Sequence, residues 1–286
     1  MKKSVIFILA IIIISLVNTS DIKAQNVLDN VYVPGHVPNR EPIPYTYLRE
    51  SDVMWSKRIW RVMDMREKIN HPLYFPKKPI NTRISMIDVI MEGVRTGDLT
   101  AYTIVDIADD DNTFVVPLTK DEIDKIGGAG IDTIYNTNPD TGDEEVKLIE
   151  IKFETAQVKQ YMMKEVWFFD NQRSVMDVRI VGMCPIRFYT KGGTDEVRME
   201  KLFWIYFPEV RPFFAKKEVY NVHNDAECRT FDDMFWKRVF SSYIIRESNV
   251  YDNRRISSYK KGLGALLEAE KIKDDLFQIE HDLWEY

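Results

Sequence analysis

The sequence predicts an α+β fold, with a mainly β middle section flanked by helical N- and C-terminal regions. Near both ends of the chain, in residues 51–70 and 230–283, apolar residues recur at helical spacing. Between them the chain is rich in β-branched and aromatic residues, which favour strands. Turn-forming clusters such as NTNPDTGDEE (residues 136–145) separate these stretches.

Residues 1–24 have the layout of a cleavable secretory signal peptide. The basic segment MKK precedes an apolar run from Val5 to Val17, and the small residue Ala24 lies before the expected cut. The run is shorter than the roughly 20 residues needed to span a bilayer, and no cysteine lies near the cut to carry a lipid. We therefore expect export of a soluble chain, with an uncleaved membrane anchor as the alternative.

The chain is acidic, and this limits its binding partners. Its 286 residues carry a formal net charge of −6. Loss of residues 1–24 removes three lysines and one aspartate and leaves −8. Because nucleic acid and anionic lipid require clustered Lys and Arg, we expect neither as a ligand. The remaining chain is long enough for one large domain with its own core.

Residues 25–50 form a proline-rich segment that we expect to be an extended arm, and residues 51–286 the α+β domain. The arm contains Pro34, Pro38, Pro42 and Pro44. Prolines at this density prevent a helix and favour extended or polyproline II backbone. The arm is either a disordered leader or a strap that packs on a neighbour, and the apolar residues of Pro42–Leu48 favour the strap.

Two helices are expected at the start of the domain. The first covers residues 51–70, with Ser51 or Asp52 as its cap and Pro72 after its end. Its apolar stripe consists of Val53, Trp55, Ile59, Trp60, Met63 and Ile69. The second covers residues 85–95.

Strands are expected over the middle section, where β-branched and aromatic residues gather between turn signals. They cover residues 101–107, 114–118, 146–153, 165–169, 175–184 and 202–207. Residues 109–112 form the turn between the first two.

Two further helices are expected at the C-terminus. Thr230 caps the first with Asp233 three residues later, and an apolar face continues to Ile244. The last helix follows Gly264, with a narrow seam that suits docking along another element. The seam consists of Leu266, Ala269, Ile272, Leu276, Ile279 and Leu283. We expect most of it to dock on the protein's own body, and Trp284 and Tyr286 to reach another subunit.

The two cysteines, Cys184 and Cys228, leave two interpretations open. An exported chain can oxidise them to a disulfide. Alternatively, Cys184 follows the apolar segment VRIVGM and packs as a buried thiol. Without a clustered histidine, the pair does not predict a zinc site.

No motif in the sequence predicts a catalytic, cofactor-binding or metal-binding residue. Ser257-Ser258-Tyr259-Lys260 matches S-x-x-K, but the accompanying motifs occur in reversed order. Asp232 and Asp233 could act as paired carboxylates, yet their place at a helix start favours capping. GGAG at residues 127–130 lacks the Lys and Ser/Thr of a phosphate loop.

Metal sites are not predicted either. Asn136, Asn138 and Asp140 resemble the start of a calcium loop, but Thr141 stands where the loop needs glycine. The four histidines are spread along the chain without a metal-binding spacing. They are His36, His71, His223 and His281.

Three long segments resemble a known family. They are KEVWFFDNQRSVMDVRIVGMCPI (residues 164–186), TFDDMFWKRVFSSYIIRESNVYD (residues 230–252) and ALLEAEKIKDDLFQIEHDLWEY (residues 265–286). Together they are similar to the gliding motility protein GldN, also called PorN, a component of the type IX secretion system. The similarity extends to residues 49–76 and 91–102.

This resemblance implies a non-enzymatic structural subunit in the periplasm. It implies association with a GldK/PorK-type lipoprotein in a ring beneath the outer membrane, and contact with the GldM/PorM-type motor subunit of the inner membrane. It carries no catalytic or metal-binding residue. Two alternatives from other classes are an envelope hydrolase acting on peptidoglycan and a glycan-binding module.

Overall fold

The computed structural model describes residues 37–80, 83–104, 114–137, 144–151, 153–190, 196–221, 224 and 227–284. They belong to one compact unit, Val37–Tyr286. The expected signal peptide, the first twelve residues of the arm and the turn at residues 109–112 lie outside the described residues. The helices of the described part include none that is long and apolar enough to cross a membrane.

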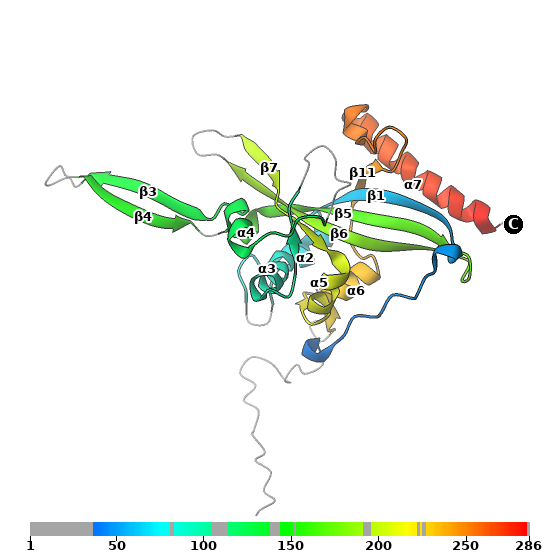
Figure 1. Ribbon diagram of the computed structural model, residues 1–286, viewed down its shortest axis with the longest axis horizontal. Helices are drawn as coiled ribbons and strands as arrows, with labels where there is room; N and C mark the ends of the chain where they lie inside the picture. Colours follow the sequence, from blue (N-terminus) through cyan, green and yellow to red (C-terminus); the bar gives the residue numbers. More distant parts are fainter. Residues whose placement is uncertain are drawn as a thin grey trace, which may run out of the picture. The chain divides into compact units, whose positions relative to one another are not determined.

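The fold is α+β, as the sequence predicts, and the structure shows that it is built around a seven-stranded antiparallel sheet (Figure 1). The strands run in the order β11-β1-β5-β6-β8-β2, and β7 pairs with β6 outside this path. Their bounds are β1 Val53–Asp64, β2 Ala101–Tyr102, β5 Val158–Asp170, β6 Val175–Thr190, β7 Val197–Lys201, β8 Trp204–Tyr206 and β11 Tyr243–Glu247. The predicted strands at residues 165–169, 175–184 and 202–207 are therefore confirmed.

The prediction of a helix over residues 51–70 is wrong, because most of this segment is the central strand β1. β1 pairs with β5 on one side, where Ile59 lies opposite Glu165, and with β11 on the other. Trp55, Ile59 and Met63 are four residues apart, a spacing that places side chains on one face in a strand as well as in a helix. Both faces of the strand are covered from Ile59 onward, so polar residues do not alternate there to reveal its period.

Three other segments of the middle section differ from the prediction. Within residues 101–107 the described strand is only β2, and residues 114–118 contribute a single bridge between Tyr102 and Pro117. β4 (Glu144–Ile151) matches the strand expected at residues 146–153. It pairs with β3 (Gly130–Thr137), a strand that was not predicted, in a separate two-stranded sheet.

Capping residues define the predicted helix near the N-terminus. α3 (Met86–Thr96) begins where the Ser85 hydroxyl accepts the Asp88 N–H and ends at Gly97, whose φ of 90° only glycine adopts readily. The other short helices are α2 His71–Tyr74, α4 Lys120–Ile126 and α5 Phe207–Ala215. Single-turn 3₁₀ segments are Val37–Asn39, Glu50–Asp52, Lys68–Asn70, Thr155–Gln157 and Ile256–Ser258, and β9 (Glu218–Val219) pairs with β10 (Arg229–Thr230).

The helix expected from Thr230 to Ile244 is shorter than predicted. Its start is confirmed: Thr230 and Asp233 form a reciprocal capping box at α6 (Phe231–Trp236). The helix then ends because Arg238 adopts a left-handed conformation, with φ of 51°, and the Val239 N–H bonds back to the Met234 carbonyl. Tyr243 and Ile244 instead belong to β11 at the edge of the sheet.

The main hydrophobic core lies between one face of the sheet and helices α2, α3, α5 and α6. Met63, Tyr161 and Met163 contribute from the strands. Four phenylalanines of α5 and α6 contact one another, with ring centroids of Phe214 and Phe235 5.6 Å apart. Each fully buried side chain of this size contributes about 1.5–3 kcal/mol. On the opposite face, Val62 packs in a smaller cluster with Trp60 and Trp204.

The last helix docks on the protein's own body, as expected. α7 (Leu263–Trp284) packs beside β11 (Figure 1) through Ala269, Ile272 and Leu276, which contact Ile59 and Ile244. The predicted seam is wrong at Leu266, which is 55% exposed. The Trp284 side chain and Tyr286, expected to reach another subunit, lie outside the described residues.

Candidate functional site

Arginines hold every carboxylate that is buried within the described residues. The pairs are Asp52 with Arg49, Asp64 with Arg66, Glu165 with Arg238, Asp170 with Arg173 and Asp232 with Arg211. Each carboxylate accepts charge-assisted hydrogen bonds. For Asp52, Asp64 and Asp170 these bonds lower the pKa of the carboxyl group, whereas a general acid needs a carboxyl group that stays protonated near neutral pH.

The Arg211–Asp232 pair is the most enclosed of these. Arg211 Nε donates to Asp232 Oδ1 at 2.8 Å, and Arg211 Nη2 donates to Oδ2 at 3.1 Å. Both side chains are nearly fully buried. Asp233 caps α6 and pairs with Arg40 at 2.8 Å. The two adjacent aspartates therefore serve separate structural contacts, and capping is confirmed for Asp233.

The described part of the proline-rich arm packs on the pair. Tyr45 lies against the Arg211 guanidinium, 4.4 Å from the ring centroid, and stacks on Trp236 with centroids 5.9 Å apart. Burial raises the Tyr45 pKa, although Arg211 opposes the shift. Tyr47, two residues later, is 89% exposed. Residues 37–49 thus form a strap over α6 and β6, anchored by the half-buried Tyr45 while Tyr47 faces outward.

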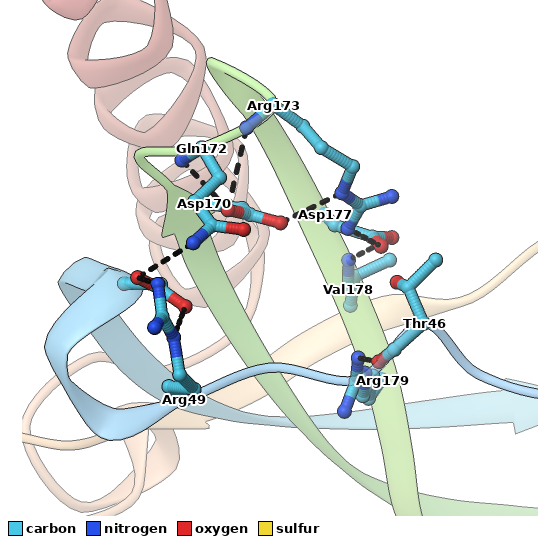
Figure 2. A network of polar contacts seen from close by, with 9 residues as sticks. Thr46, Arg49, Asp170, Gln172, Arg173, Asp177, Val178 and Arg179 are labelled. Atoms are coloured by element: carbon cyan, nitrogen blue, oxygen red, sulfur yellow. Dashed lines mark hydrogen bonds and ion pairs between the residues drawn. The ribbon is translucent and has the colours of Figure 1, made fainter.

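A polar network fixes the end of the strap to the turn between β5 and β6 (Figure 2). Asp52 accepts from Arg49 and Gln172, while Asp170 accepts from Arg173 at 2.7 Å. The hydrogen bond from Arg49 lowers the pKa of Asp52, and the one from Arg173 lowers that of Asp170. Both carboxylates therefore remain ionised. Asp52 joins the end of the strap to the β5–β6 turn, and Asp170 stabilises that turn. Arg179 also donates to the Thr46 carbonyl at 2.6 Å.

Asp64, at the end of β1, has the most clearly lowered pKa among the described acidic side chains. Burial would raise its pKa, but hydrogen bonds from Arg66 and Gln160 lower it from 3.8 to about 2. Arg66 reaches both carboxylate oxygens, and Gln160 donates at 2.9 Å. This carboxylate is fully ionised at neutral pH and acts as an acceptor that closes the turn after β1.

The S-x-x-K segment has no catalytic geometry. The serine of the motif, Ser257, is exposed in the single turn Ile256–Ser258, and Lys260 Nζ pairs with Glu268 at 2.5 Å. A lysine that acts as a base must be aimed at the serine, whereas here it contacts a carboxylate. Lys260 thus connects the segment to α7.

The glycine-rich GGAG segment ends helix α4 rather than beginning a helix. The Gly128 N–H bonds to the Lys125 carbonyl and the Ala129 N–H to the Asp124 carbonyl. Phosphate loops place such N–H groups toward a ligand at a helix N-terminus, and these are already satisfied by the helix.

No group of three His, Cys, Asp or Glu residues within the described residues could hold a metal ion. His71 Nε2 lies 3.2 Å from the Arg66 carbonyl, and His281 lies beside Asp282. Asn136 is part of β3, while Asn138, Asp140, His36 and His223 lie outside the described residues.

Cys184 is a buried thiol, as the second of the two interpretations predicts. It lies in β6 with no exposed surface, and its Sγ donates to the Pro185 carbonyl at 3.7 Å. It is not bridged to Cys228.

An open groove with an apolar and aromatic lining lies at the α2 end of the fold. Its volume is about 670 Å³. The lining residues are Lys68, His71, Pro72, Phe75, Pro76, Ile80, Arg83 and Tyr220. Ile80 is 60% exposed, and the Arg83 guanidinium stacks on the Tyr220 ring at 4.7 Å. We call this feature the α2 groove; its residues carry no motif, and only folding brings Tyr220 to the others.

The outward face of α7 is also unusually apolar. Leu263, Leu266, Leu267 and Phe277 are all more than half exposed, and Phe277 is 70% exposed. Exposed apolar side chains grouped on one element indicate a surface for contact with another protein. The seam predicted from the sequence drew attention to this helix, but not to Phe277.

In the described fold the buried carboxylates are held in contacts between elements, and the exposed apolar groups lie on open surfaces suited to contact with another protein. The chain belongs to the family described as gliding motility associated protein GldN, whose model matches residues 48–285. Among curated proteins none matches the chain. The resemblance stated from the sequence is therefore confirmed, and the chain is a gliding motility associated protein.

Proposed function

We propose that this protein is a non-enzymatic periplasmic subunit of the type IX secretion and gliding motility machinery. It forms a ring with a GldK/PorK-type outer-membrane lipoprotein and couples to the GldM/PorM-type motor subunit of the inner membrane. The ring places it at the inner face of the outer membrane, where it transmits force or conformational change between motor and secretion channel.

The observation that carries this proposal is the family match over residues 48–285. Two physical features support it. Arginines hold the buried carboxylates of the described chain, an arrangement suited to a rigid body rather than to proton transfer. The α2 groove and the outward face of α7 supply apolar contact surface, which stable interfaces use as their anchors.

Affinity purification from the detergent-extracted envelope tests the proposal. A tagged full-length chain is expected to recover the lipoprotein and the motor subunit, and crosslinking mass spectrometry would map their contact faces. Recovery of neither partner from intact envelopes would contradict the proposal. So would conversion of peptidoglycan by the purified chain, if one polar substitution abolished that activity.

The same purification tests whether the arm contributes to the assembly. Deletion of residues 25–36 leaves the compact unit intact, because that unit begins at Val37. Loss of the lipoprotein from the deleted chain would assign the contact to this part of the arm. The Tyr45→Ala and Tyr47→Ala variants separate the strap's two tyrosines: only the first is packed on α6.

A further inference from the structure

We propose that the α2 groove of one copy receives the outward face of the last part of α7 (residues 274–284) from a second copy. This inference rests on the proposed function and specifies how its subunits contact one another. The contact joins two different surfaces, so it is heterologous. A heterologous contact repeats from copy to copy and closes into a ring when its rotation permits.

The charges of the two surfaces are opposite. Residues 274–284, DDLFQIEHDLW, contain four carboxylates and no Lys or Arg. Lys68 and Arg83 line the α2 groove, and no carboxylate is among its described lining residues. Lys77 and Lys78 follow directly on the lining residue Pro76 and are exposed. In a chain with a net charge of −6, such a basic group facing an acidic helix provides electrostatic complementarity.

The apolar parts of the two surfaces also match. Phe277 stands in the middle of the acidic stretch and is 70% exposed. The groove offers Phe75, Ile80 and Tyr220 as partners, and each of them is at least 44% exposed. A buried aromatic side chain removes roughly 150–250 Å² from water and often forms the anchor of an interface. The volume of about 670 Å³ accommodates such a side chain together with its neighbours.

A second copy is the occupant because α7 is held elsewhere in its own chain. Ile272 and Leu276 fix the helix on β11 and Ile59, while the groove lining comes from residues 68–83 and Tyr220. Phe277 follows Leu276 directly, about 100° further around the helix, so it lies beside the anchoring seam rather than in it and is 70% exposed. It therefore remains exposed unless another molecule covers it.

Site-directed crosslinking tests the contact in the full chain within cells. Phe277→Cys is combined with Ile80→Cys in a Cys228→Ser background, and a short bis-maleimide joins the two thiols. The contact predicts a ladder of products at multiples of the chain mass. The single variants, and a Val250→Cys/Ile80→Cys pair, serve as controls; Val250 is 91% exposed and lies outside both surfaces. No ladder, or products only with other proteins, would overturn the proposal.

Charge reversal provides a second test, by sedimentation of the purified chain. Lys77→Glu/Lys78→Glu and Asp274→Lys/Asp275→Lys are each expected to weaken self-association about tenfold or more, and their combination to restore it. Lys125→Glu/Lys261→Glu changes the net charge by the same amount as Lys77→Glu/Lys78→Glu, but at two other exposed lysines, and should leave self-association intact. Equal self-association of all variants, with circular dichroism showing folded chains, would overturn the proposal.

Recovery of the lipoprotein distinguishes this inference from the proposed function. If Phe277→Asp leaves self-association unchanged and the lipoprotein is recovered, only the α7–groove contact is refuted. If the crosslinked ladder forms but no lipoprotein or motor subunit is recovered, the contact stands and the proposed function fails.

Discussion

Arginine–carboxylate pairs stabilise this protein at positions far apart in the sequence. Arg211 and Asp232 connect α5 to α6, and Arg238 reaches Glu165 in the centre of the sheet at 2.9 Å. Paired charges in a low-dielectric interior contribute little net stability relative to apolar residues, but removal of one partner is costly. These residues therefore help to specify one arrangement of the elements.

For the Arg211–Asp232 pair, removal of one partner should cost more stability than replacement of both partners by apolar residues. Arg211→Met is expected to lower the free energy of unfolding by about 3–5 kcal/mol, because it leaves Asp232 charged and buried. The double variant Arg211→Met/Asp232→Leu should lose much less than the sum of the single variants. Urea unfolding measures both. Lys273→Ala removes an exposed pair with Glu270 and should cost at most about 1 kcal/mol; additive losses at 211 and 232 would contradict the interpretation.

Asp64 predicts a pH dependence of stability. Its pKa is about 2 in the folded chain against an ordinary value of 3.8. Because the folded value is the lower one, the carboxylate stabilises the fold above pH 3.8, and this contribution is lost as the pH falls toward 2. Asp64→Asn should therefore unfold at lower urea than the parent at neutral pH, with a gap that shrinks in acid. Asp98→Asn, at an exposed position, is the control; a gap that does not change with pH would refute the role of Asp64.

At the scale of the elements, β1 shows how tertiary contacts select between two structures. Its side chains at a spacing of four fit a helix and a strand equally well. The decision depends on hydrogen bonds to β5 and β11, which lie about a hundred or more residues away along the chain. In α7 the apolar residues are three or four residues apart over a longer stretch. A spacing of three would place them on opposite faces of a strand, so this pattern predicts a helix, and the helix is confirmed.

The docking of α7 should depend on its buried side only. Leu276, 4% exposed, packs against Ile59 and Ile244, whereas Leu266 is 55% exposed on the same helix. Leu276→Ala is expected to cost about 2–5 kcal/mol, and Leu266→Ala less than about 0.5 kcal/mol. Amide hydrogen exchange would show faster opening of α7 in the first variant. Similar exchange in both variants would mean that the cluster with Ile59 does not hold the helix.

At the scale of the whole molecule, the proposed function depends on export and on assembly. The apolar run from Val5 to Val17 is the basis for the proposed periplasmic location. The α2 groove and α7 provide the surfaces for the proposed assembly. The proposed scaffold would require both, because its proposed partners lie in the cell envelope.

Interruption of the apolar run tests the location. Ile11→Arg/Ile13→Arg should prevent export and processing, because charge at the centre of a signal peptide blocks its insertion into the translocation machinery. Intact mass and cell fractionation would then find an unprocessed chain outside the periplasm. Ile11→Leu/Ile13→Leu keeps the run apolar and should be processed near residue 24. Identical processing of both variants would refute the role of the run.

The sequence by itself determined the fold class, the capping of α6 by Thr230, the periodicity of α7 and the family. These properties depend on residues close together along the chain or on long segments compared directly. Only the tertiary structure decided that residues 53–64 form a strand and that Tyr220 completes the α2 groove. Hydrogen bonds between strands and the linings of grooves join residues far apart in the chain, and local spacing does not encode which of them meet.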